Sequence, residues 1–177
     1  MRVPLGHMAA VMAAFSLSAG PAAAQTAAGS EAASFNERFE GRWDGGGNVV
    51  LSNDPRDPVN VSCTVNGQGN AQQIAISGTC RAAVIFGREI AANLTYDPAS
   101  DRYVGTYVGS KAGPARLEGR RSGDTVTLNV TYAQPVGSDR SAVMTIRHQG
   151  GNQFSLTVTD DLGQGPQPTT QLAFAQR

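Results

Sequence analysis

Histidine is the scarcest of the residues in this sequence that could do chemistry. His7 lies in an apolar N-terminal stretch, which leaves His148 as the single histidine of the remaining chain. A Ser–His or Cys–His nucleophilic site would require His148, and no G-x-S-x-G motif accompanies it. Zinc and copper sites with several histidine ligands require more than one such residue. We therefore expect no metal ion, no cofactor and no catalysis of these classes.

Aspartates stand in segments that have the composition of turns: Asp124, Asp139 and the pair Asp160–Asp161. Glycosidase chemistry needs two carboxyl groups across a cleft, one of them desolvated. Aspartates in turns usually accept hydrogen bonds from the nearby backbone and stay solvated. We therefore interpret Asp160 and Asp161 as solvated turn residues. An enzyme that uses paired carboxylates is the third, least favoured of three functional hypotheses.

Basic and acidic residues balance over the whole chain, with 14 of each. This balance excludes the strong net attraction that drives nucleic-acid binding. The densest basic segment contains Arg116, Glu118, Arg120 and Arg121, of which the first three share one face of a predicted strand. We interpret that face as solvated, and the alternative is contact with anionic lipid headgroups or a polysaccharide.

The N-terminal residues have the order of a secretory signal. Arg2 precedes an apolar stretch over 8–17, and the small-residue run 22–24 provides an A-x-A cleavage site. The apolar stretch is shorter than the roughly 20 residues of a membrane-spanning helix. The predicted location is therefore the periplasm or the extracellular space of a bacterium, with the outer membrane as the alternative. No transmembrane span is expected after signal cleavage.

Three segments make up the predicted domain organisation. Residues 1–24 are the signal peptide, and 25–38 form a flexible leader, because that segment is small and polar up to one predicted helical turn at 35–39. Residues 39–177 form a single β-barrel domain.

The two cysteines, Cys63 and Cys80, fit an exported protein. An even cysteine count outside the cytosol predicts a disulfide, and the spacing is far too long for a C-x-x-C redox motif. A bond that closes a loop of this length contributes roughly 3 kcal/mol to stability. We expect it to link two neighbouring strands.

Apolar and polar residues alternate over most of the chain after residue 40, which predicts half-buried strands. The clearest run places Val126, Leu128, Val130 and Tyr132 on one face, with threonine and asparagine on the other. Glycine, proline, asparagine and aspartate separate the runs as turn residues. We expect about ten strands, with 80–87 and 89–96 forming one bent strand. The predicted segments are 41–51, 59–65, 71–77, 80–87, 89–96, 102–109, 114–120, 125–133, 141–148, 152–159 and 169–176.

Sequential hairpins favour an all-β fold, an antiparallel up-and-down barrel of about 8–10 strands, because closure removes exposed sheet edges. A β-sandwich is the alternative, although it usually needs longer crossing connections. A barrel in the outer membrane would need a lipid-facing apolar band and aromatic girdles. Aromatic residues make up 6% of the chain and do not gather at the ends of the predicted strands, which argues against that architecture.

The tripeptide Gly41-Arg42-Trp43, at the start of the first predicted strand, resembles the G-x-W of lipocalins and other calycins. In that superfamily the tryptophan packs across the closed end of the barrel, and an arginine from the last strand region lies on its ring. The resemblance implies a calycin-type barrel in which Trp43 is structural and Arg177 or Arg147 stacks on it. The sequence departs from the lipocalin pattern in that it has no clear second or third motif.

These features predict a non-enzymatic barrel that binds a small apolar ligand or a lipid in its interior. Side chains that combine an apolar body with a polar tip are the candidate ligand contacts. They are Tyr96, Tyr103, Tyr107, Tyr132, Met144 and His148. The alternative is an interaction or inhibitor protein that contacts a cell-envelope protein or a surface polysaccharide through a rigid β-scaffold.

Overall fold

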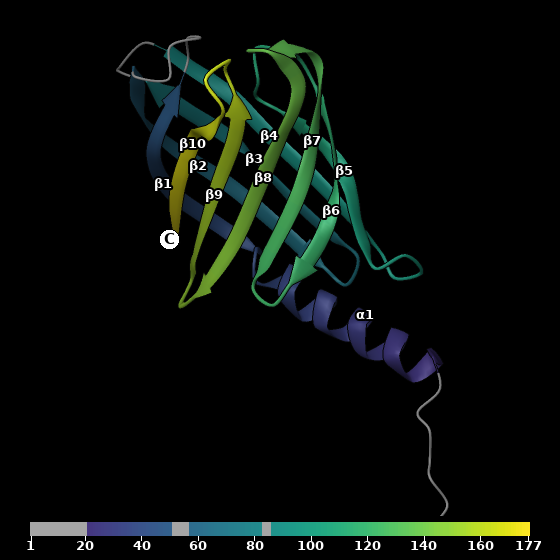
Figure 1. The fold of residues 1–177 in the computed structure, drawn as a ribbon. Helices are drawn as coiled ribbons and strands as arrows, with labels where there is room; N and C mark the ends of the chain where they lie inside the picture. The colour runs from purple at the N-terminus through teal and green to yellow at the C-terminus, as the bar shows by residue number, and fades with distance from the viewer. Residues whose placement is uncertain (1–20, 51–56, 83–85) are drawn as a thin grey trace, which may run out of the picture.

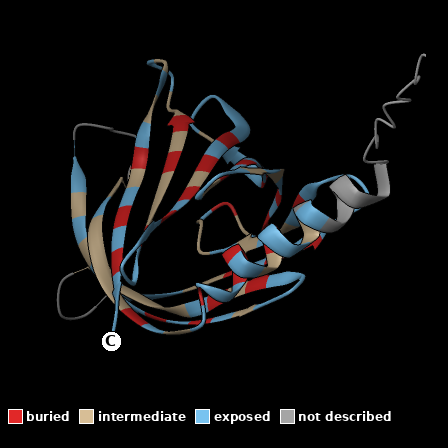
Figure 2. Ribbon diagram, turned by 90° about the horizontal axis from the view of Figure 1, so that it is seen from below, coloured by how far each residue is buried: buried red, intermediate tan, exposed pale blue. Residues whose placement is uncertain are grey.

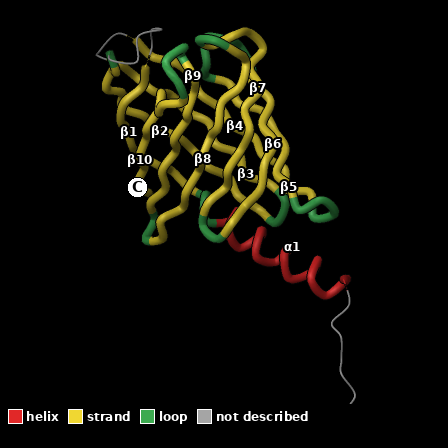
Figure 3. Tube along the Cα trace, viewed as in Figure 1, coloured by secondary structure: helices red, strands yellow, loops and turns green. Residues whose placement is uncertain are grey.

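Ten antiparallel strands close into a barrel, and a helix lies at one end of it (Figures 1 and 3). This computed structural model describes residues 21–50, 57–82 and 86–177, so most of the predicted signal peptide lies outside the described residues. The elements are α1 (Pro21–Glu37), β1 (Gly41–Val50), β2 (Pro58–Asn70), β3 (Gln73–Ala82), β4 (Phe86–Asp97), β5 (Arg102–Val108), β6 (Ala115–Ser122), β7 (Thr125–Val136), β8 (Asp139–Gly150), β9 (Gln153–Asp161) and β10 (Pro166–Gln176).

The barrel closes by pairing its first strand with its last. Every strand pairs with its neighbours in the chain, and β1 also pairs with β10, where Trp43 stands opposite Gln176. Hairpin connections between antiparallel neighbours produce this up-and-down order, and closure protects the strand edges. The predicted antiparallel up-and-down barrel is confirmed, and the sandwich alternative is wrong.

The strand boundaries near residue 80 differ from the prediction. The single bent strand predicted from 80–87 and 89–96 is wrong, because β3 ends at Ala82 and β4, its antiparallel partner, begins at Phe86. The sequence pattern predicts a break between 71–77 and 80–87, whereas β3 runs without interruption through Gly78. A Cβ at Gly78 would lie 2.1 Å from the Thr64 carbonyl oxygen. This glycine therefore lets β2 and β3 approach closely and does not end the strand.

The inner face of the barrel is most tightly packed near α1. Trp43, Val65, Tyr103, Val126 and Leu128 are each 0% exposed. Away from that end, a set of inner-face apolar residues is only partly buried, and we call this set the accessible wall. Its members are Val49, Val61, Cys80, Ile90, Tyr107 and Leu156. Figure 2, seen from the α1 end, shows buried and exposed positions alternating along the strands, as expected for a sheet with one inward face.

Helix α1 covers one end of the barrel. Phe35 in its last turn and Phe39 just after it are buried, with ring centroids 5.3 Å apart. A Cβ at Gly67 on β2 would lie 1.9 Å from the Phe39 carbonyl oxygen. The segment that follows the helix can therefore rest on β2 only because β2 carries glycine there.

The helix occupies most of the segment that the sequence predicts as a flexible leader, 25–38. The segment is rich in alanine, which has the highest helix propensity. Its burial of Phe35 gives the helix the tertiary contact that a short isolated helix lacks. The helical turn predicted at 35–39 spans the end of this longer helix at Glu37 and the turn that follows it.

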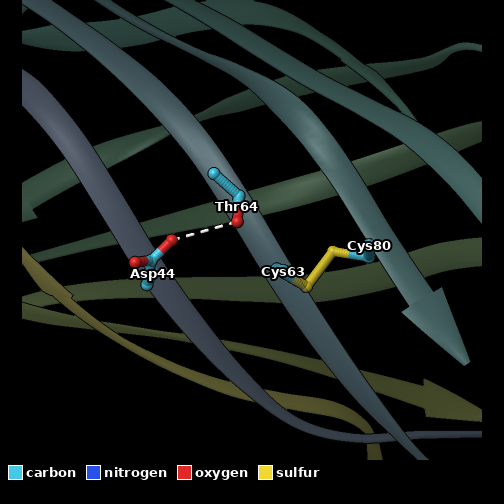
Figure 4. The surroundings of a disulfide bond; sticks show 4 residues. All are labelled: Asp44, Cys63, Thr64 and Cys80. Carbon is cyan, nitrogen blue, oxygen red and sulfur yellow. Dashed lines mark hydrogen bonds between the residues drawn. A yellow bond between two sulfur atoms is a disulfide. The ribbon is translucent and has the colours of Figure 1, made fainter.

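Cys63 and Cys80 form the predicted disulfide between neighbouring strands. They stand directly opposite each other in the β2–β3 ladder. Figure 4 shows this bond together with the Thr64 hydroxyl, which donates a hydrogen bond to Asp44 Oδ1 at 3.0 Å. Since successive side chains alternate across a sheet, Thr64 faces outward and Cys63 faces the barrel interior. Within the described residues, no helix has the length and apolar character that a membrane span requires.

Candidate functional site

Two of the predicted ligand contacts, Tyr96 and Tyr103, lie in the packed end of the barrel beside α1. Their rings are 5.1 Å apart, and Tyr103 donates a hydrogen bond to Asn36 Oδ1 on α1 at 2.8 Å. The Tyr96 hydroxyl donates to Asp101 Oδ1 at 2.9 Å. Burial raises the pKa of Tyr103 to about 12, so its hydroxyl stays protonated and keeps donating to the helix. Tyr103 therefore holds α1 on the barrel, and Tyr96 packs beside the Tyr103 ring.

His148 lies in the same packed end and is 4% exposed. Its Nδ1 accepts a hydrogen bond from the Gly150 backbone at 3.3 Å, and its Nε2 has no hydrogen-bond partner among the described residues. Burial lowers the pKa of His148, so the neutral imidazole is favoured. The Phe39 ring stands edge-on to it at 5.4 Å.

Trp43 closes the packed end from β1. Its indole Nε1 donates to the Phe39 carbonyl at 3.1 Å, and the Phe154 ring lies 4.9 Å away in an edge arrangement. Arg177, one of the two arginines expected on this ring, forms an ion pair with Asp44 at 2.7 Å. The other, Arg147, is exposed on the face of β8 opposite to His148.

The other three predicted contacts lie elsewhere on the inner face. Met144, opposite Leu128 and Val158 in the ladder, is 1% exposed. Tyr107 belongs to the accessible wall, and Tyr132 is buried on β7. In the ladder, Tyr107 and Tyr132 are the partners on either side of Ala115. The structure therefore divides the six predicted residues between two regions of the barrel and does not gather them into one site.

A polar cluster that the sequence analysis misses lies beside Tyr132. Asp160 is 4% exposed in β9, and its Oδ1 accepts a hydrogen bond from the Tyr132 hydroxyl at 3.0 Å. Its Oδ2 accepts one from the buried Thr169 hydroxyl of β10. Gln167 stands opposite Asp160 in the ladder, and its Nε2 is buried with no partner among the described residues. We call Tyr132, Asp160, Gln167 and Thr169 the Asp160 cluster.

The prediction that Asp160 is a solvated turn residue is wrong. The alternation of β9 continues through Val158 to Asp160, which keeps the carboxylate on the inner face. Asp161, the next residue, points the other way and accepts hydrogen bonds from the Gly163 and Gly165 backbone, as a turn residue does. The alternation of inward and outward side chains along β9 is the sequence feature that predicts an inward-facing Asp160.

The Asp160 cluster has an unusual charge balance for a buried site. Among the described residues, no cation forms an ion pair with Asp160. Arg140 instead donates from Nε to the Tyr132 carbonyl at 3.0 Å. Burial and the nearby Asp160 raise the pKa of Tyr132, so its hydroxyl stays protonated and donates to the carboxylate.

A row of paired inner-face residues runs from β9 and β10, the strands of Asp160 and Thr169, to the accessible wall. Leu156 of β9 stands opposite Leu172 of β10. Leu172 in turn stands opposite Gly47 of β1, and Gly47 stands opposite Val61 of β2. Gly47 contributes no side chain to this row. The neighbours of Gly47 in this row are the buried Leu172 and the partly buried Val61. An apolar surface next to a few fixed polar groups is the composition of small-molecule sites.

A separate surface cleft of about 290 Å³ lies between α1 and the β6–β7 turn. Its charges are paired: Arg38 with Asp124 at 2.5 Å and Arg121 with Glu31 at 3.0 Å. It is lined by Ser30, Glu31, Ser34, Arg38, Arg121, Gly123 and Asp124.

The basic segment on β6 is also paired with acidic residues. Glu118 accepts from Arg102, and Arg120 lies 3.5 Å from Asp101. Arg116, Glu118 and Arg120 are exposed on the outer face, as the solvated interpretation expects. No group of three or more potential metal-ligating side chains occurs among the described residues.

Comparisons with known proteins bear on the fold. No family model and no curated protein matches the sequence. Among solved structures, the chain is similar to the crystal structure of Rv2717c from M. tuberculosis, with a TM-score of 0.60 and 14% sequence identity. The match covers 79% of this chain and 93% of that chain. At this identity the likeness supports the barrel fold alone.

Proposed function

We propose that this protein is an exported, non-enzymatic barrel that holds a small, mostly apolar molecule in its interior, against the accessible wall. One observation carries the proposal. Inner-face residues beside α1, such as Trp43 and Val126, are 0% exposed, whereas Val61, Ile90 and Leu156 are only partly buried. A barrel that served only as a rigid scaffold would gain stability by filling this region with side chains.

The disulfide supports the export part of the proposal. Cys63 and Cys80 are bonded, and disulfides persist mainly outside the reducing cytosol. The N-terminal segment with its apolar stretch and small-residue run agrees with passage into the periplasm or to the outside.

The resemblance to calycins is part of the same proposal. Trp43, from the G-x-W tripeptide, packs at the closed end of an antiparallel barrel, which is where that superfamily places its tryptophan. The neighbours of its ring are aromatic, from Phe154 and His148, in place of the expected arginine.

A second candidate function is contact with a cell-envelope protein or polysaccharide. One observation favours it: Val104 and Val108 are 43% and 46% exposed on the same outer face of β5. Single exposed valines are common on monomeric proteins, so this patch is the weaker of the two arguments.

A titration with a neutral apolar fluorophore, N-phenyl-1-naphthylamine, tests the proposal. The protein should bind it saturably, and Val61→Trp, which adds an indole to the accessible wall, should abolish that binding. Ser62→Trp adds the same indole to the exposed outer face of β2 and serves as the matched control. Equal binding by both variants, or no saturable binding by the wild type, would contradict a ligand site in the interior.

A further inference from the structure

The Asp160 cluster specifies the chemical class of ligand. We infer that the interior site takes a molecule with an apolar body and one cationic group, an ammonium or amidinium, which Asp160 receives. This inference rests on the proposed function, because it requires an interior ligand.

The first step is that the Asp160 carboxylate is buried without a cationic partner among the described residues. Asp160 is 4% exposed and accepts one hydrogen bond on each oxygen, from Tyr132 and from Thr169. Both donors are hydroxyls, which carry no positive charge. A buried charge is costly unless a countercharge accompanies it, and none of the described residues supplies one. A bound cation would supply it.

The second step is the shape around the carboxylate. In the ladder, the inner-face neighbour of Asp160 on β8 is Ala142, a small residue next to Val130 of β7. Tyr132 reaches Asp160 from β7 past this alanine. Because alanine is the smallest side chain that borders this carboxylate, we place the cationic group of the ligand on the Ala142 side of Asp160.

The third step is the aromatic surroundings. Tyr132 and Tyr107 are the ladder partners on either side of Ala115, and all three lie on the inner face. Aromatic faces attract ammonium and guanidinium groups, most strongly where water is excluded. The accessible wall, of which Tyr107 is a member, then contacts the apolar body of the same molecule.

An anionic ligand is the competing chemistry. Arg88 on β4, opposite Cys80 in the ladder, is the cationic residue whose charge acts on Tyr107. Its guanidinium donates to the Gly109 carbonyl at 3.1 Å, and the side chain is exposed. Solvent already stabilises this charge, whereas Asp160 is buried. The geometry therefore favours the cation over the anion.

Three probes with one tail measure the preference: decylammonium, decanol and decanoate, titrated by calorimetry into protein expressed from the full sequence. We expect decylammonium to bind about tenfold or more tightly than decanol, since hydrogen bonds to charged groups outweigh neutral ones. Decanoate should bind most weakly. Asp160→Asn should remove the preference for the ammonium and leave decanol affinity unchanged.

Glu89→Gln is the matched control, because it removes the same charge from an exposed residue of β4. It should keep the wild-type preference. Equal loss in both variants would mean that net charge, not Asp160, attracts the ammonium, and would overturn the inference.

A wild-type measurement covers the case in which Asp160→Asn does not fold. In bound decylammonium, the methylene next to nitrogen should show intermolecular nuclear Overhauser effects to Tyr132 ring protons. Effects only to outer-face residues such as Val104 would overturn the inference.

The three-probe titration separates the two proposals. If decanol and decylammonium bind equally, the cation assignment fails while the interior site survives. If none of the three probes binds, the proposed function itself fails.

Discussion

The Tyr132 hydroxyl is one of two donors that solvate the buried Asp160 carboxylate. Tyr132→Phe removes this donor and leaves the ring in place. Because an under-solvated buried acceptor carries a desolvation penalty, we expect the free energy of unfolding to fall by about 1–3 kcal/mol. Urea denaturation at neutral pH measures this loss.

Tyr107→Phe is the control for that variant, since the structure gives the Tyr107 hydroxyl no hydrogen bond within the described residues. It should change stability far less. Similar losses in the two variants would contradict the role given to the Tyr132–Asp160 bond.

His148 makes stability depend on pH. Its usual pKa is 6.5, which applies to the unfolded chain, and burial in the folded protein lowers that pKa. Between the two values the unfolded state binds more protons, so stability is full above 6.5 and is lost as pH falls below it. We expect the wild type to lose more stability between about pH 7.5 and about pH 5 than His148→Phe does.

Denaturant titrations of both proteins at the two pH values test this prediction. The phenyl ring keeps the edge contact with Phe39 but cannot be protonated. Parallel losses of stability would show that other groups cause the pH dependence.

At the residue scale, the sequence predicts which side chains of a strand face the barrel interior, because successive side chains alternate between the two faces. We call this alternation strand parity. Parity alone places Tyr132, Met144 and His148 on the inner face, and the structure agrees. It cannot tell which inner residues are packed under α1 and which are accessible, because that depends on contacts with distant strands and the helix. Asp160 was missed because its local composition is typical of a turn, and local composition outweighed parity.

At the scale of elements, α1 depends on close backbone approach at Gly67. Gly67→Ala places a Cβ 1.9 Å from the Phe39 carbonyl oxygen and 3.1 Å from Trp43 Nε1. The segment after α1 must then shift away from β2, and we expect a loss of about 1–3 kcal/mol, typical of overpacking. Thermal unfolding followed by circular dichroism measures it.

Gly87→Ala on β4 is the matched control, since the nearest atom to its Cβ would be Thr79 Cγ2 at 3.6 Å, an ordinary contact. We expect little change in the midpoint of unfolding. A Gly67→Ala variant as stable as the control would mean that α1 is not seated on β2.

Sequence predicts most strands and does less well at glycines and at the N-terminal segment. Uninterrupted alternation gives β7 and β8 nearly in full. The sequence pattern predicts a break between 71–77 and 80–87, where Gly78 lies, because a glycine that ends a strand and one that permits close packing look alike in sequence. The helix was interpreted as a leader because its stability comes from the burial of Phe35 and Phe39, a tertiary contact.

At the scale of the whole molecule, the two ends of the barrel differ in a way that accounts for the proposed function. Aromatic rings from α1, β1, β8 and β9 fill one end, and Tyr103 fastens the helix there. Away from it, apolar inner-face residues keep accessible surface beside a buried carboxylate. We propose that a barrel packed beside its helix, with partly buried apolar residues elsewhere on the inner face, holds a small molecule against those residues.

Native mass spectrometry of the protein isolated from its own host tests this central claim most directly. The account predicts a bound species of between about 200 and 1,000 Da, the size of molecule that barrel interiors accommodate. Val61→Trp, isolated in the same way, should carry none. A wild-type protein whose mass is that of the bare polypeptide, in material never exposed to detergent or solvent, would contradict the claim.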